Sequence, residues 1–138
     1  MENLATDLDA RLAALWQVLA RHDKRELNRT AASVLATLRD RGARRITELA
    51  ESEAIAQPSA TTLVGRLERD GLVQRAPDPD DARAVRVHLT DAGLKRLAER
   101  RAARAVLLEA RLARLTDDER AALTAALPVL DKMLEGTD

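Results

Sequence analysis

The sequence predicts a mainly helical domain with one β-hairpin, and three observations lead to this fold class. The 138 residues match the length of one domain, with 46% apolar and 33% charged residues, as in a globular protein. Alanine and leucine dominate the apolar residues, and both favour helices. Apolar residues recur every three or four positions along most of the chain, but one short segment alternates instead.

The composition excludes several classes of protein. The chain has no cysteine, so disulfides, a zinc ribbon and a thiol switch are impossible. Its longest stretch without an ionisable side chain, from Ala54 to Gly65, is too short and too polar to span a bilayer. The N-terminus lacks the pattern of a secretory signal. We therefore expect a cytoplasmic protein that has no membrane partner.

Two helices are expected first, and both are amphipathic. Leucines and one tryptophan form a single stripe that ends near residues 22–24: Leu4, Leu8, Leu12, Leu15, Trp16 and Leu19. Asn28 is a good N-cap for the second helix, and Gly42 is a good terminator.

A short third helix around Leu49 and Ala50 is expected to end near residues 54–57. Pro58 then opens a fourth helix, because proline is tolerated at a first helical position, and Gly71 closes it. The apolar stripe of the fourth helix leaves small polar and basic residues on its other face: Ser59, Thr61, Thr62, Gly65, Arg66 and Arg69.

The period changes after Gly71. Residues 72–76 and 84–89 form two short runs, the second of them alternating, on either side of a loop rich in proline and aspartate. A calcium loop counted from Asp78 would need glycine at its sixth position and glutamate at its twelfth, where Arg83 and Leu89 stand. The pattern therefore predicts a hairpin turn in which Asp81 orients Arg83, and no metal site.

Two more helices are expected after the hairpin. Residues 90–93 provide caps for a long fifth helix, and Thr116 with Glu119 forms a capping box for the last one. The last helix carries a leucine stripe that Pro128 is expected to kink. Its members are Leu123, Leu127, Leu130 and Leu134.

A short helix, a brief turn and a helix that begins with small polar residues are typical of a helix-turn-helix, whose second helix enters the major groove of DNA. A hairpin directly after it adds a wing, and an arginine at its tip would read the narrow minor groove. This order of elements predicts a winged helix-turn-helix protein that binds double-stranded DNA.

Several motifs resemble those of the MarR family of winged-helix transcriptional regulators. The resemblance covers nearly the whole chain. It rests on Leu-Glu-x-x-Gly-Leu-Val-x-Arg from Leu67 to Arg75, Asp-x-Arg at Asp81 and Arg83, Leu-Thr-x-x-Gly from Leu89 to Gly93, Glu48-Leu49-Ala50, Pro58-Ser59-Ala60-Thr61 and Thr116-x-x-Glu119.

The resemblance implies a single domain, residues 1–138, that works as a homodimer and most often as a repressor of a pseudo-palindromic operator. Residues of about 1–26 and 116–138, with part of 91–115, would form the dimerisation region, and about 28–90 the winged lobe. The implied DNA-binding residues are Gln57, Pro58, Ser59, Thr61, Thr62, Arg66, Asp81, Arg83 and Arg86.

One alternative remains open, that of a protein-interaction module with the same dimer fold that has lost specific DNA binding. Three features motivate it. Residues 44–90 carry seven arginines against eight acidic residues, and DNA-binding lobes are usually basic. In addition, Ala82 stands where the family often has an arginine, and Gly65 replaces a more usual polar residue.

No cofactor and no catalytic activity are expected. The two histidines, His22 and His88, have no carboxylate cluster around them in the sequence, and no serine lies in a nucleophile motif. A small-molecule effector is implied by the resemblance alone. Trp16 is a weak candidate to line its site, and packing at a helix crossing is the more common role for such a residue.

Overall fold

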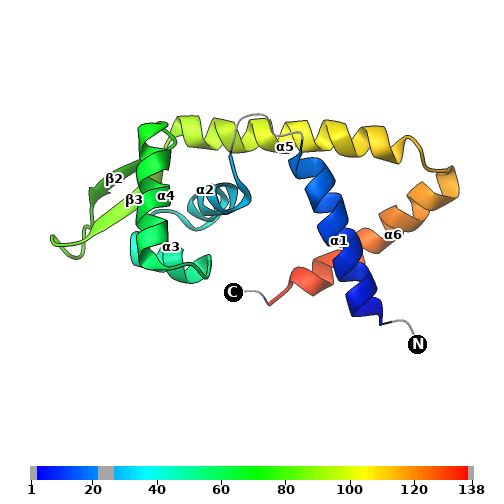
Figure 1. Cartoon of the computed structure of the whole chain (residues 1–138), viewed down its shortest axis with the longest axis horizontal. Coiled ribbons are helices and arrows are strands. Elements are labelled where there is room, and N and C mark those ends of the chain that lie inside the picture. Colours follow the sequence, from blue (N-terminus) through cyan, green and yellow to red (C-terminus); the bar gives the residue numbers. More distant parts are fainter. Residues whose placement is uncertain (1–2, 22–26, 137–138) are drawn as a thin grey trace. The chain divides into compact units, whose positions relative to one another are not determined.

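The structure is a computed structural model, and it describes residues 3–21 and 27–136. Within these ranges it confirms the mainly helical fold, with six helices and one small sheet (Figure 1). Contacts divide the chain into two compact units, residues 1–102 and 103–138. The elements are α1 (Leu4–Ala20), α2 (Arg29–Arg41), β1 (Arg44–Arg45), α3 (Ile46–Ser52), α4 (Gln57–Arg69), β2 (Val73–Pro77), β3 (Val85–Leu89), α5 (Asp91–Leu112) and α6 (Asp117–Leu134).

Local capping explains why most helices begin and end where the sequence predicts. The Asn28 side chain accepts a hydrogen bond from the Ala31 N–H at 2.8 Å, and Gly42 ends α2 with a φ of 81°. Gly71 follows α4 with a φ of 75°. Two boundaries differ: α1 ends at Ala20, before residues 22–26, which lie outside the described ranges, and Pro58 is the second residue of α4, not the first.

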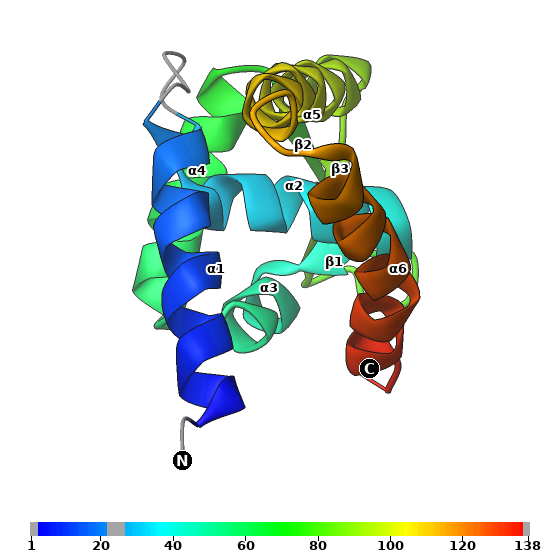
Figure 2. The same ribbon diagram turned by 90° about the vertical axis from the view of Figure 1, so that its right-hand side faces the viewer.

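The core of the first unit lies between α2, α3, α4 and the sheet (Figure 2). Its largest fully buried side chains are aliphatic, and each helix or strand supplies them at the spacing of its own period: Val34, Leu35, Leu49, Val64, Leu67, Val73 and Val87. Burial of such a side chain stabilises the fold by about 1.5–3 kcal/mol. This packing fixes which face of α4 is turned toward solvent.

The sheet has the order β1-β3-β2, and both pairings are antiparallel. The β2–β3 hairpin confirms the predicted wing, with Val73 opposite Leu89 and Pro77 opposite Val85. The third strand was not predicted, because β1 has only two residues, too few to show an alternating pattern. It pairs Arg45 with Arg86 across the sheet.

Gly93 allows the first turn of α5 to lie directly against the chain that leaves α4. The Thr90 hydroxyl donates to the Gly71 carbonyl at 2.6 Å and accepts from the Gly93 N–H at 3.1 Å. The Thr90 N–H also donates to the Leu72 carbonyl at 3.2 Å. A Cβ on Gly93 would overlap the Leu72 carbonyl oxygen, so only glycine fits this junction.

The second unit comprises the end of α5 and α6. Thr116 and Glu119 form the predicted capping box, with hydrogen bonds of 2.8 and 3.2 Å. The helix continues through Pro128 to Leu134, and the kink expected there stays a prediction. None of the residues of α6 is buried.

We predict opposite effects when alanine replaces two helical glycines. Gly93→Ala should lower the free energy of unfolding by about 2 kcal/mol, because the added methyl group forces α5 away from the Leu72 backbone. Gly65→Ala should raise it by up to about 1 kcal/mol, because the Cβ would meet only the Arg75 Nη2, at 3.9 Å, and alanine favours the helix. Urea unfolding measures both. Equal effects of the two substitutions would show that the Gly93 junction is not tight.

Candidate nucleic-acid interface

Helices α3 and α4 form the predicted helix-turn-helix. The end of α3 is closed by backbone hydrogen bonds from Glu53 to Leu49 and from Ile55 to Ala50, both at 3.0 Å. Ala54 has a positive φ of 52° in this turn. Because Ala60, Val64 and Leu67 of α4 are buried, its opposite face must be exposed.

The predicted groove-facing residues are all exposed on α4: Gln57, Pro58, Ser59, Thr61, Thr62 and Arg66. The hydroxyls of Thr61 and Thr62 donate to the carbonyls of Gln57 and Pro58, each at 3.0 Å. These hydroxyl protons are therefore committed to the helix. Each threonine presents to solvent the remaining lone-pair capacity of its oxygen and a methyl group.

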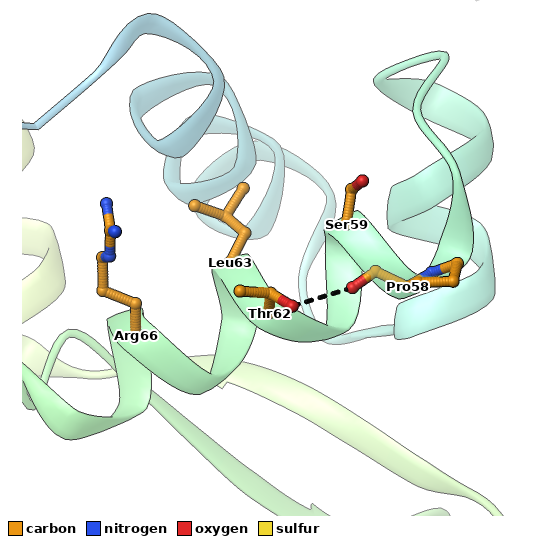
Figure 3. A pocket seen from close by; sticks show the side chains of 5 residues that line it. All are labelled: Pro58, Ser59, Thr62, Leu63 and Arg66. Atoms are coloured by element: carbon orange, nitrogen blue, oxygen red, sulfur yellow. Dashed lines mark hydrogen bonds between the residues drawn. The ribbon is translucent and has the colours of Figure 1, made fainter.

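The surface is hollowed along this part of α4, as Figure 3 shows. The depression measures about 390 Å³ and is lined by Pro58, Ser59, Thr62, Leu63 and Arg66. The side chains of Ser59, Leu63 and Arg66 project from the same side of the helix, where they place a hydroxyl, an apolar group and a cation in one row (Figure 3). This mixture can hydrogen-bond to base edges and contact apolar groups beside them.

Arg83 stands at the tip of the wing with 96% of its side chain exposed. Asp81 contacts it in two ways: its Oδ1 accepts the backbone N–H of Arg83 at 3.0 Å and lies 3.8 Å from the guanidinium Nε. The backbone contact is the closer one. Asp81 therefore fixes the chain at Arg83 and leaves the guanidinium available to another anion.

Sequence reasoning missed a buried carboxylate at the base of the wing. It treated Asp78 as one of several turn residues, but the structure buries its side chain completely. The Asp78 Oδ2 accepts hydrogen bonds from Arg45 Nε at 2.8 Å and Arg86 Nε at 3.1 Å, and its Oδ1 accepts one from the Asp80 N–H at 2.8 Å. The Asp80 N–H and the Arg45 guanidinium hold the pKa of Asp78 down, at about 2.

Arg86 takes part in this cluster. Besides Asp78 it contacts Asp80, with Nη2 to Oδ2 at 3.4 Å, and 32% of its side chain is exposed. Its assignment as a DNA contact stays a prediction, and the structure adds a second role for it inside the wing.

The net charge of the winged lobe is close to zero, but its ion pairs involve only some of its arginines. Arg45 and Arg86 share Asp78, and Arg75 pairs with Glu68 at 3.6 Å. In the described part of the chain, neither Arg66 nor Arg69 has an ion pair within 4.0 Å. The exposed arginines left available are therefore Arg66 and Arg69 of α4 and Arg83 at the wing tip. Arg44 also has no ion pair within the described residues, but it is only partly exposed and donates to the Ala43 carbonyl.

The structure also locates the remaining candidates. The guanidinium of Arg29 lies over the Trp16 ring, 5.0 Å from its centroid, in a cation–π contact. His88 is exposed on β3, and His22 lies outside the described residues. Residues 3–21 and 27–136 contain no group of three or more acidic or histidine side chains that could hold a metal ion. No helix within those ranges is long and apolar enough to cross a membrane.

Comparisons with known proteins agree with this geometry. The model of the MarR family matches residues 27–85. The HTH-type transcriptional regulator Mb0904 of Mycobacterium bovis is 34% identical, over 92% of this chain and 90% of its own length. The chain belongs to the MarR family.

Other relatives support the fold and the class of function. The HTH-type transcriptional repressor MdtR of Bacillus subtilis is 32% identical, over 86% of this chain and 79% of its own length. A crystal structure of a protein from Pseudomonas aeruginosa, 31% identical in sequence, has a TM-score of 0.81 and covers 96% of this chain and 94% of its own. This MarR-family protein is thus a DNA-binding transcriptional regulator with a winged helix-turn-helix.

We predict that the Asp78 cluster makes stability depend on acid pH. The folded state lowers the pKa of Asp78, so the carboxylate stabilises the fold above about pH 4, and this contribution is lost as the pH falls toward 2. The free energy of unfolding of wild type should exceed that of Asp78→Asn near neutral pH, and the difference should shrink between about pH 4 and 2.

The matched control is Asp80→Asn in the same turn, since the Asp80 side chain is 79% exposed. That substitution should change the free energy of unfolding little at any pH. A difference between wild type and Asp78→Asn that is constant from pH 7 to pH 2 would contradict the role of the charged carboxylate.

Proposed function

We propose that this MarR-family regulator is a homodimeric repressor that binds a pseudo-palindromic operator and carries out no catalysis. It acts on DNA in the cytoplasm. Residues of about 1–26 and 116–138, with part of 91–115, form the dimerisation region, and about 28–90 form the winged lobe. The observation that carries this proposal is the exposed polar face of α4, in the same compact unit as a wing with an outstretched arginine.

Helix α4 enters the major groove. Arg66 is exposed and can donate to the O6 and N7 atoms of guanine, and the Ser59 hydroxyl can donate to or accept from a base edge. Thr61 and Thr62 offer acceptor oxygens and methyl groups, which suit an amino group or the methyl group of thymine. Backbone and side-chain groups at the start of α4 contact phosphate and set the register.

The wing tip enters the minor groove. The exposed Arg83 is suited to a narrow groove, where the negative potential is strongest. Asp81 holds the backbone at this position, so less conformational freedom is lost when the arginine inserts.

A second copy of the chain covers the apolar side chains that α6 exposes. Leu123, Leu127 and Leu130 are 50%, 57% and 37% exposed, and they lie on one face of the helix with Leu134. Exposed apolar patches of this kind mark interfaces between proteins. In the first unit, α1 likewise exposes Leu4, Leu12 and Leu15, which a second copy could also cover.

A small-molecule effector would release the DNA by favouring a spacing of the two α4 helices that misses the ~34 Å repeat of the half-sites. Trp16 is the aromatic side chain available to line its site, and Arg29 beside it supplies a cation. The proposal of repression is supported by relatives such as MdtR, which is named as a repressor.

We predict that Arg83→Ala weakens operator binding by about tenfold or more, because the variant loses the minor-groove contact. The oligomeric state and the melting temperature should not change, since the side chain is 96% exposed. Fluorescence anisotropy with a duplex that the wild type selects from a random pool, and with a scrambled duplex, measures both affinities at two salt concentrations.

Arg101→Ala is the matched control, because it removes the same charge from an exposed position of α5. It should weaken binding to both duplexes by a similar small factor. If Arg83→Ala behaves in the same way, the arginine is not a specific contact. If wild type binds both duplexes equally and weakly, the chain is an interaction module and the proposed function is wrong.

We predict that Leu127→Asp converts the dimer to a monomer, because it places an unpaired charge in the apolar contact. Ala125→Asp is the control, since it adds the same charge on the opposite, exposed face of α6. Light scattering coupled to size exclusion measures the mass of each. A Leu127→Asp variant that stays dimeric would place the interface elsewhere.

A further inference from the structure

Two arginines face each other at the base of the wing. Arg45 of β1 and Arg86 of β3 are Cα partners in the antiparallel pairing of these strands. Like charges directly opposite each other destabilise a pair of strands. Asp78 places an anion between them through one oxygen, at 2.8 Å from Arg45 and 3.1 Å from Arg86, and this offsets their repulsion.

The same aspartate also shapes the loop that carries Arg83. The Asp78 N–H donates to the Ala84 carbonyl at 3.0 Å, and this hydrogen bond joins the two ends of the loop. Its Oδ1 accepts the Asp80 N–H at 2.8 Å and so fixes the first turn inside the loop. One side chain thus ties the wing loop to a strand that precedes the helix-turn-helix.

Burial separates Asp78 from its neighbours. The Asp78 side chain is fully buried, whereas those of Asp80 and Asp81 are 79% and 42% exposed. A buried charge persists only when it is paired and hydrogen-bonded, as this one is. Deleting it would release two arginines beside the wing, where both could bind phosphate without regard to sequence.

We propose that Asp78 is a positioning residue for operator recognition: it fixes the wing loop so that Arg83 reaches the minor groove, and it withholds Arg45 and Arg86 from non-specific phosphate contact. This proposal rests on the proposed function. It assigns to Asp78 a share of the specificity of binding, although the side chain touches no DNA.

The direction in which DNA affinity changes in Asp78→Asn distinguishes a positioning role from a simple effect of charge. Asp78→Asn removes a negative charge from the lobe, which by Coulombic attraction alone would strengthen binding to every duplex. Loss of positioning instead weakens binding to the operator alone. The ratio of operator affinity to scrambled-duplex affinity is therefore the quantity to measure.

We expect the ratio to fall about tenfold in Asp78→Asn, with unchanged or tighter binding to the scrambled duplex. The probes are the selected duplex and its scrambled counterpart, used with the full-length protein. Asp80→Asn removes the same charge from an exposed position of the same turn, and its ratio should remain that of wild type. A ratio that is unchanged in Asp78→Asn would overturn the proposal.

A double-mutant cycle with Arg83→Ala distinguishes positioning from a general loss of stability. If Asp78 acts through Arg83, then adding Asp78→Asn to Arg83→Ala should lower operator affinity no further. An equal loss in both backgrounds would show a role independent of Arg83 and overturn the proposal. Circular dichroism and melting curves establish that each variant is folded at the temperature of the titration.

Arg45→Gln provides a second variant if Asp78→Asn does not fold. Its side chain belongs to β1, outside the wing, and it removes one of the two cationic partners of Asp78. Operator affinity should fall in this variant as well, and again not in the Arg83→Ala background. A loss of operator affinity that persists without Arg83 would count against positioning.

Nuclear magnetic resonance supplies a readout that does not involve DNA. The Nε–H protons of Arg45 and Arg86 should exchange slowly in wild type and rapidly in Asp78→Asn, since both donate to the buried carboxylate. Rapid exchange in wild type would overturn the geometry itself. Protected protons in a wild type that shows no preference for any duplex would instead overturn the proposed function, and with it the role of Asp78 in recognition.

Discussion

The winged lobe depends on how the apolar stripe of α4 packs against α3 and the sheet. Val64 and Leu67 are almost completely inaccessible, in the same core as Leu49 and Val87. Because a helix has a fixed period, burying this stripe decides the direction of every other side chain on α4. The polar face that we assign to the major groove is therefore a consequence of the core. The tight junction at Gly93 then sets the start of α5 against the chain that follows α4.

The individual ion pairs of the winged lobe say more about its binding to DNA than its net charge does. The near balance of arginine and acidic residues between 44 and 90 suggests weak attraction to DNA, but the acidic groups are used unevenly. Asp78 binds two arginines at the base of the wing. The Glu68 carboxylate contacts both the guanidinium and the backbone N–H of Arg75. Among the described residues, what remains exposed and unpaired on α4 is Arg66 and Arg69, and Arg83 is exposed at the wing tip. The acidic residues organise the lobe as well as reduce its charge.

The burial of apolar residues differs between the two surfaces of the proposed function, the one for DNA and the one for a second copy. The lobe buries its apolar residues within one chain, so its exposed face is polar and suits a hydrated, charged partner. Helix α6 buries none of its residues and exposes leucines along one face, so it suits an apolar partner such as a second copy. In the proposed function, binding to DNA and association between copies thus use residues of different kinds on different elements.

The amino-acid sequence by itself determined most helix boundaries, the wing and the outward face of α4, because these depend on caps, glycines and periodicity within a few residues. Asn28, Gly71 and the Thr116–Glu119 box act where the sequence places them. Only the tertiary structure decided what β1 and Asp78 do. A two-residue strand carries no periodic signal, and three neighbouring aspartates look equivalent until a partner 33 positions away buries one of them. Burial and ion pairing across such separations are properties of the packed chain, so no local pattern contains them.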